Sequence, residues 1–252
     1  MKIFVCNNYE SMSKKAANLV MEVVKQNPNP VLGLSTGGTP LGLYKELVNL
    51  YEKGELDFSN TVSFNLDEYF PIDPGDKNSY NYYMEQNLFS KVNMKASFVP
   101  NGKVSDPEVE CADYERKIQK YGGIDLQVLG IGGNAHIGFN EPAAELNRYT
   151  FVTDLDQNTI KANSIYFENI EEMPKKALTM GMTSIFSAKK IILLASGESK
   201  SQAVKNMVYG KITTMIPASI LALHSDVVVI LDKEAAKFLE EGDYEHCYDI
   251  NQ

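Results

Sequence analysis

The residues best suited to chemistry lie in a glycine-rich segment near the middle of the chain. Residues 130–142 read Gly-Ile-Gly-Gly-Asn-Ala-His-Ile-Gly-Phe-Asn-Glu-Pro and follow a short apolar run, 124–129, that predicts a buried strand. His136 can transfer protons near neutral pH, and the nearby carboxylate of Glu141 can orient the imidazole and favour its charged form. Taken alone, the segment is equally compatible with proton transfer and with a structural turn.

A second segment carries groups that suit an anion. Residues 31–40 read Val-Leu-Gly-Leu-Ser-Thr-Gly-Gly-Thr-Pro and predict a strand, a glycine-rich turn and a helix that starts near Pro40. Backbone N–H groups beside the positive end of a helix bind anions, and Ser35, Thr36 and Thr39 add hydroxyl donors. The segment lacks the lysine of a P-loop and the glycine spacing of a dinucleotide site, which favours a small phosphate ester. A plain tight turn is the alternative.

Lys200 is a second candidate contact for a phosphate. It follows Gly197-Glu198-Ser199 in the first turn of a helix predicted to run to about residue 208. A lysine at that place opposes the helix dipole unless an anion is bound. An exposed surface lysine is the alternative.

Two adjacent acids, Asp67 and Glu68, follow a strand predicted over residues 60–65. Such a pair usually lies in a solvated loop or caps a helix, but a position at the end of a strand also suits a catalytic carboxylate. The polar, turn-rich residues 71–78 that follow predict a mobile flap.

The elements that must position these groups alternate along the chain. Buried or short strands are predicted over 2–6, 31–34, 60–65, 98–99, 124–129, 191–195 and 226–231, and an extended stretch over 151–153. Helices are predicted over 11–26, 41–53, 105–121, 157–163, 174–182, 200–208 and 233–241. This alternation predicts a single α/β domain over residues 1–252, with a Rossmann-like, mostly parallel open sheet and helices on both faces. Ligands of such sheets bind at the carboxyl ends of the strands.

Composition excludes several functional classes. The chain has 252 residues and a formal net charge of −9, which argues against a general nucleic-acid binder. No apolar run approaches the roughly 18 residues of a membrane span, and the first residues enter a strand without a signal-peptide pattern. We therefore expect a cytoplasmic protein that binds neither nucleic acid nor membrane.

The metal-binding and redox-active residue types are few. The three cysteines, Cys6, Cys111 and Cys247, are scattered and form no CxxC pair, so we expect reduced, inert thiols. With only three histidines in the chain, a multi-histidine metal site is not expected.

Several segments together resemble the glucosamine-6-phosphate deaminase family. They are residues 32–47, residues 64–69 with Ser79-Tyr80, and residues 130–142. The likeness continues through Ala162-Asn163-Ser164, 174–181 and His224-Ser225-Asp226, and so covers nearly the whole chain in order. The related 6-phosphogluconolactonases share the fold but usually carry different residues after the central glycines.

The resemblance implies conversion of glucosamine 6-phosphate and water into fructose 6-phosphate and ammonia, with no metal or organic cofactor. It implies that Asp67 is the base of the enolisation step, which moves a proton between C2 and C1, and that His136 assists opening of the sugar ring. Asn134 and Glu141 would hold His136, and the backbone near Gly138 would contact the sugar. The phosphate would be held by Gly37, Gly38, Thr39 and Lys200.

The sequence departs from the pattern of the resembled family at three positions. Asn134 stands where some members have aspartate, and Ala135 where many have glycine, which costs stability if the backbone there has a positive φ. Ile165 stands where an arginine is common, and the loss of its guanidinium predicts weaker phosphate binding.

The resemblance also raises the questions of allosteric regulation and of alternative functions. Some members are hexamers activated by an acetylated amino-sugar phosphate, but the basic residues for that are not evident here, so no such activation is expected. The galactosamine 6-phosphate epimer as substrate, a lactone hydrolase and a sugar-phosphate sensor without turnover remain alternatives. Both a monomer and a homo-oligomer are compatible with the sequence.

Overall fold

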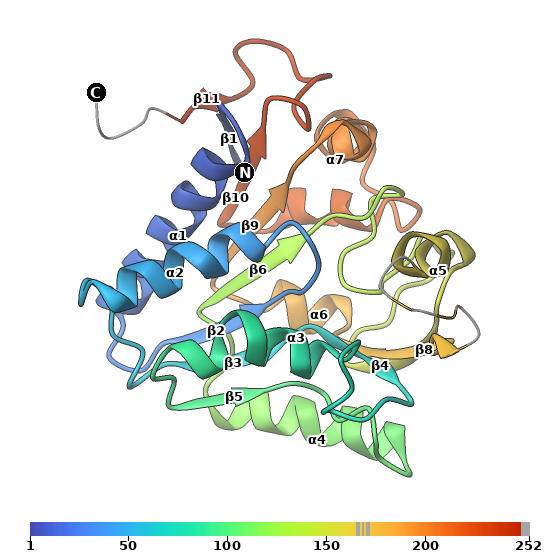
Figure 1. Ribbon diagram of the computed structural model, residues 1–252. Helices are drawn as coiled ribbons and strands as arrows, with labels where there is room; N and C mark the ends of the chain where they lie inside the picture. Colours follow the sequence, from blue (N-terminus) through green and yellow to red (C-terminus); the bar gives the residue numbers. More distant parts are fainter. Residues whose placement is uncertain (165–166, 168, 170–171, 248–252) are drawn as a thin grey trace.

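The computed structural model describes residues 1–164, 167, 169 and 172–247 (Figure 1). Its main sheet has eight strands in the order β11-β1-β10-β9-β6-β2-β3-β5, and all neighbouring strands are parallel. The strands are β1 (Lys2–Cys6), β2 (Val31–Leu34), β3 (Val62–Asn65), β5 (Ala96–Phe98), β6 (Leu126–Gly130), β9 (Lys190–Ala195), β10 (Val227–Asp232) and β11 (Glu245–His246). The predicted Rossmann-like parallel sheet is confirmed.

Helices cover both faces of this sheet, as predicted (Figure 1). On one face, Leu32 and Leu34 of β2 pack with α1 (Tyr9–Gln26), α2 (Leu41–Glu52) and α3 (Tyr80–Asn87). On the other face, Val62 and Phe64 of β3 share a second core with α4 (Pro107–Lys120), α6 (Met182–Phe186) and α7 (Ser201–Tyr209). Successive side chains of a strand point to opposite faces, so strands buried on both sides are apolar throughout.

The structure describes three short 3₁₀ helices in full. They are η1 (Phe89–Lys91), η4 (Glu198–Lys200) and η5 (Pro217–Leu223). The prediction of a helix over 233–241 is wrong, because residues 233–238 form successive turns after β10.

A second, antiparallel sheet was not predicted. Its order is β4-β8-β7, with β4 (Asp67–Phe70), β8 (Lys176–Thr179) and β7 (Phe151–Asp154), and α5 (Gln157–Asn163) lies beside it (Figure 1). The helix expected at 174–182 is therefore wrong, and Asp67 and Glu68, for which a solvated loop or a helix cap was one alternative, begin a strand. The two segments, 67–70 and 176–179, are both strands. Their strand character comes from pairing between segments about a hundred residues apart, which the local residue pattern does not contain.

The cysteine expectation is also wrong in part. Cys6 and Cys247 form a disulfide, with their Cα atoms 4.6 Å apart. The pairing of β11 with β1 brings them together, and the N–H of Cys247 donates to the carbonyl of Val5 at 2.9 Å. Cys111 is a free, buried thiol as expected, and burial together with neighbouring glutamates raises its pKa to about 12.

The strand order places a ligand-binding edge in the middle of the main sheet. From β2 the chain proceeds through β3 to β5 on one side, and from β6 through β9 to β10 on the other. The order therefore reverses between β2 and β6, and open α/β sheets bind ligands at the carboxyl ends of the strands at such a point. In the part of the chain that the structure describes, no helix is long and apolar enough to cross a membrane.

Candidate active site

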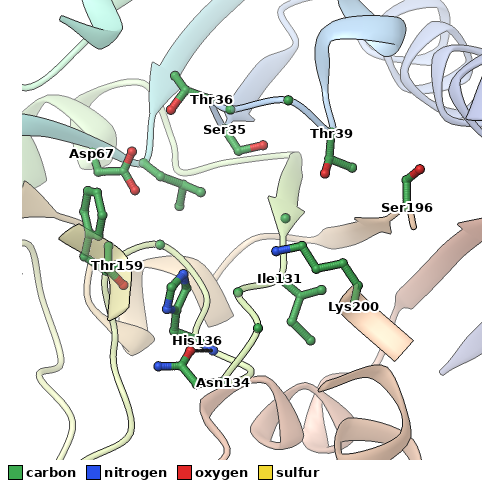
Figure 2. Close-up of a pocket in the computed structure, with 18 of the residues that line it drawn as sticks. Ser35, Thr36, Thr39, Asp67, Ile131, Asn134, His136, Thr159, Ser196 and Lys200 are labelled. Atoms are coloured by element: carbon green, nitrogen blue, oxygen red, sulfur yellow. Dashed lines mark hydrogen bonds between the residues drawn. The ribbon is translucent and has the colours of Figure 1, made fainter. Parts of the chain in front are cut away.

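A cavity of about 880 Å³ opens at this reversal point (Figure 2). The loops that follow four adjacent strands, β9, β6, β2 and β3, form its walls, and α1, α3 and α5 close its sides. Its lining residues are Tyr9, Ser35, Thr36, Gly37, Gly38, Thr39, Leu66, Asp67, Tyr80, Gly130, Ile131, Gly132, Gly133, Asn134, His136, Gly138, Phe139, Thr159, Ser196, Ser199 and Lys200.

One end of the cavity is built to hold an anion. The loop after β2, residues 35–39, runs into the amino terminus of α2, where the helix dipole is positive. Gly37 has φ +97°, a conformation that glycine adopts without strain. A Cβ atom at Gly38 would meet no atom within 4 Å, so this glycine faces open space. The Ser35 hydroxyl is buried and has no hydrogen-bond partner among the described residues, which leaves it available to a ligand.

Lys200 faces the same end of the cavity. In Figure 2 its side chain extends toward the cavity from the β9 side, with Thr39 and Ser196 nearby and with Asp67 and His136 on the opposite side of the view. Burial lowers the pKa of the Lys200 ammonium, and within the described residues it forms no ion pair. An anion in the cavity would compensate this partly buried positive charge.

Asp232 at the end of β10 holds the turn that carries Lys200. Its carboxylate accepts hydrogen bonds from the Ser196 hydroxyl at 2.5 Å and from the Gly197 N–H at 3.0 Å. Gly197 has φ +86°, so the turn depends on glycine at that position.

The opposite end of the cavity contains a histidine fixed by a carboxylate. His136 Nδ1 lies 2.9 Å from the Glu141 carboxylate, which also accepts hydrogen bonds from the Asn134 amide and the Thr159 hydroxyl, each at 2.6 Å. Burial alone would raise the pKa of Glu141, but the hydrogen bonds it accepts and the charge of His136 lower it below its ordinary value. Glu141 itself does not line the cavity, and it acts on the cavity through His136.

The backbone of this loop is shaped around the imidazole. A Cβ atom at Gly132 would lie only 2.3 Å from His136 Nε2, so any larger residue there would displace the ring. Ala135 has φ +66°, the conformation for which an alanine in place of the common glycine was expected to be costly.

A buried carboxylate, Asp67, completes this end. It is only 6% exposed, and a Cβ atom at Gly138 would lie 3.6 Å from its Oδ2, so the loop after β6 closes directly over it. Burial, and then the negative charge of Glu68, raise the pKa of Asp67 to about 8. A carboxylate with a pKa close to neutral pH is well suited to act as a general base.

Glu68 has a different environment from its neighbour. Its carboxylate accepts backbone N–H groups of Tyr69, Tyr80 and Asn81, each at 2.9 Å, the last two at the amino terminus of α3. Burial raises the pKa of Glu68, and these hydrogen bonds oppose that effect. Glu68 therefore fixes α3 beside the cavity, while Asp67 is directed into it.

The chain is similar to known proteins along almost its whole length. The model of the family described as glucosamine-6-phosphate isomerases/6-phosphogluconolactonase matches residues 7–230. The chain belongs to this family.

Members of the family cover the chain almost completely. It is 52% identical over 245 residues to a glucosamine-6-phosphate deaminase of Thermoanaerobacter sp. (strain X514), covering 96% of this chain and 97% of the relative. It is 54% identical over 241 residues to one of Clostridium botulinum (strain Kyoto / Type A2), covering 95% and 99%.

Solved structures of the family show the same fold. A structure described as a monomeric glucosamine-6-phosphate deaminase superposes with a TM-score of 0.92 at 46% identity, covering 94% of this chain and 99% of that one. The 6-phosphogluconolactonase from Trypanosoma cruzi superposes with a TM-score of 0.73 at 22% identity, covering 94% and 96%, which shows the shared fold alone.

The fold gathers the residues that sequence analysis proposed for the site. Every proposed residue lines the cavity except Glu141, which is bonded to His136. Ile165, where the arginine common in the family is absent, lies outside the described residues. Among the described residues, no cluster of three His, Cys, Asp or Glu side chains could hold a metal ion.

Several lining residues were missed by sequence analysis. Ser196 directly follows β9, so the rule that sites lie at the carboxyl ends of strands could have found it. Tyr9 and Thr159 reach the cavity from helices, and nothing in their local sequence signals this.

Proposed function

We propose that this protein is a glucosamine-6-phosphate deaminase, which converts glucosamine 6-phosphate and water into fructose 6-phosphate and ammonia. The observation that carries the proposal is the division of one cavity into two ends. A buried base and a carboxylate-held imidazole occupy one end, and an anion-binding loop with a partly buried lysine occupies the other.

The phosphate of the substrate would bind at the end formed by residues 35–39 and Lys200. Backbone N–H groups, the α2 dipole and the lysine charge would together hold a dianion that takes no part in the reaction. Binding energy from such a group orients the sugar for the chemical steps. The effect of Ile165 on this binding stays a prediction.

Ring opening is the task that we assign to His136. It requires a proton to leave the C1 hydroxyl and a proton to reach the ring oxygen, and an imidazole can perform both transfers. Glu141 bonds Nδ1, which leaves Nε2 for the substrate. Asn134 and Thr159 hold Glu141 and thereby act through it as positioning residues.

Enolisation is the task that we assign to Asp67. The proton on C2 of the open-chain substrate is bound to carbon, and its removal needs a positioned base in a site with little water. Delivery of that proton to C1 leaves an imine at C2. Water then adds to C2, and the amino group leaves as ammonia to give the ketose. Burial keeps the basicity of Asp67 higher than that of an exposed aspartate.

The assay that tests the proposal follows both products without added metal. We expect equal release of ammonia and fructose 6-phosphate from glucosamine 6-phosphate. Turnover of galactosamine 6-phosphate alone would assign the epimer as substrate, and hydrolysis of 6-phosphogluconolactone alone would assign a lactonase. Binding of glucosamine 6-phosphate without turnover would identify a sugar-phosphate sensor. Each of these three outcomes would overturn the proposal.

The pH dependence tests the role of Asp67. Because only the ionised carboxylate accepts a proton, kcat/KM should fall as pH drops below about 8, the raised pKa of Asp67. The nearby charge of Glu68 disfavours ionisation of Asp67, so Glu68→Gln should lower this pKa and move the acidic limb to lower pH.

The control for this measurement is Asp113→Asn, which removes the same charge from a half-buried position on α4, where Asp113 pairs with Arg116. Its acidic limb should coincide with that of the wild type. An unchanged limb in Glu68→Gln, with thermal unfolding like that of the wild type, would contradict the coupling of the two acids.

A further inference from the structure

Three tyrosine hydroxyls from three different helices hold the backbone of the 35–39 loop. Tyr44 of α2 donates to the Ser35 carbonyl at 2.5 Å, and Tyr83 of α3 donates to the Gly37 carbonyl at 2.7 Å. Tyr9 of α1 lies 3.0 Å from the carbonyls of both Gly38 and Thr39, so its single proton is shared between them.

These contacts determine where the N–H groups of the loop point. In a planar trans peptide, the N–H of one residue points opposite to the carbonyl of the residue before it. Holding the Ser35, Gly37 and Gly38 carbonyls therefore directs the N–H groups of residues 36, 38 and 39 away from the tyrosines. Those three N–H groups donate no hydrogen bond to any described residue, and all three residues line the cavity. The carbonyl of Thr39 precedes Pro40, which has no N–H.

The helix packing fits this arrangement. The Tyr9 hydroxyl also accepts the Gly42 N–H at 2.7 Å, so it joins the loop to the first turn of α2. A Cβ atom at Gly42 would lie 2.2 Å from the Ser13 hydroxyl oxygen and 2.9 Å from the Tyr9 ring. Glycine at position 42 thus permits α1 to approach α2 closely enough for Tyr9 to reach the loop.

We infer that Tyr9, Tyr44 and Tyr83 are positioning residues that orient the backbone N–H groups of residues 36, 38 and 39 toward the phosphate of the substrate. We call these three residues the tyrosine clamp. The inference rests on the proposed use of this loop as the phosphate site. The tyrosines occupy the carbonyl side of the loop, which leaves the N–H side to an anion.

The protonation state and packing of the tyrosines agree with this role. Burial raises the pKa of Tyr44, so its hydroxyl keeps its proton and remains a donor. Tyr44 and Tyr83 also pack edge to face with ring centroids 6.5 Å apart, which links α2 and α3 behind the loop.

The test replaces one hydroxyl at a time by hydrogen, and Tyr83→Phe is the first variant because Tyr83 is only partly buried. A single neutral hydrogen bond corresponds to a change of about two- to ten-fold. We expect KM for glucosamine 6-phosphate and the inhibition constant of inorganic phosphate to rise together by such a factor, while kcat changes by less than two-fold. The double variant with Tyr9→Phe should show a larger rise in both constants.

The matched control is Tyr82→Phe, the next residue on α3, whose hydroxyl makes no hydrogen bond within the described residues. It should leave both constants and the thermal unfolding midpoint unchanged. Unchanged phosphate inhibition in Tyr83→Phe and in the double variant would overturn the inference. So would a rise in KM without a parallel rise in the phosphate constant.

Titration calorimetry with inorganic phosphate separates this inference from the proposed function. If the wild type binds phosphate but turns over no amino-sugar phosphate, the proposed function fails and the clamp can still be measured. If phosphate binds the wild type and the Tyr9/Tyr83 double variant with equal affinity, the inference about the tyrosine clamp is wrong, whether or not the protein turns over an amino-sugar phosphate.

Discussion

Replacing Asp67 with asparagine will lower kcat for glucosamine 6-phosphate by about 10²- to 10⁴-fold, the range that a positioned acid or base contributes to catalysis. Asparagine has nearly the same shape as aspartate but cannot accept the C2 proton. Steady-state kinetics on the purified variant measure the loss. KM and the inhibition constant of inorganic phosphate should stay within about three-fold of the wild type, because the phosphate end of the cavity is unchanged.

A second readout shows that the missing function is proton transfer at carbon. In heavy water, the base that removes the C2 proton exchanges it with solvent or delivers it to C1. Nuclear magnetic resonance of the recovered sugar phosphates should therefore show that the proton leaves C2 with the wild type, by exchange or by transfer to C1, and that it stays on C2 with Asp67→Asn. Retained exchange in the variant would assign the base to another group, and Glu68 would be the first to test.

The matched control for Asp67→Asn is Asp154→Asn. Asp154 ends β7 with a side chain that is 83% exposed, and its partner is Lys176 at 3.8 Å. An exposed ion pair contributes about 1 kcal/mol or less to stability, so this control should keep full activity and a nearly unchanged unfolding midpoint. A comparable loss of kcat in the control would indicate a general sensitivity to charge.

The parts of the fold that sequence analysis anticipated are those encoded locally. Apolar runs such as 191–195 and 226–231 predict buried strands wherever they occur, and the glycine-rich turns after β2 and β6 mark the strand ends. Because the carboxyl ends of parallel strands meet at one edge, correct strand ends were enough to bring residues 35–39, Asp67, His136 and Lys200 together.

The parts that were missed depend on contacts between distant segments. β4 and β8 are short, and each is a strand because of its partner, with Asp67 opposite Thr179 and Phe70 opposite Lys176. The Cys6–Cys247 disulfide joins residues 241 apart, which are neighbours only after β11 has paired with β1. Neither the strand pairing nor the disulfide can be predicted from the pattern of neighbouring residues.

Some residues of the site were missed for the same reason, because their side chains reach the cavity from helices distant in the sequence. Tyr9 bonds carbonyls 29 and 30 residues away, and Thr159 bonds Glu141 across 18 residues. Sequence reasoning found the groups that carry charge or lie in glycine turns. It did not find the neutral hydroxyls that hold those groups in place, because a tyrosine or threonine on a helix is ordinary wherever it occurs.

His136→Gln gives the second large effect, an expected loss of about 10²- to 10³-fold in kcat. Glutamine can hydrogen-bond to Glu141 but cannot transfer protons between the C1 hydroxyl and the ring oxygen. We expect a smaller loss than for Asp67→Asn, since sugar rings also open in water without a catalyst. His246→Gln is the control, because His246 lies exposed on β11, and its kcat should equal that of the wild type.

The double variant, Asp67→Asn with His136→Gln, decides whether the two residues act on successive steps. If His136 serves ring opening and Asp67 serves enolisation, the slower step limits the rate, so the double variant should be about as slow as Asp67→Asn alone. If both residues act in the same transition state and independently, their losses should multiply. A rate equal to the product of the two losses would contradict the assignment of His136 to ring opening, and would place the imidazole beside Asp67 in the enolisation step.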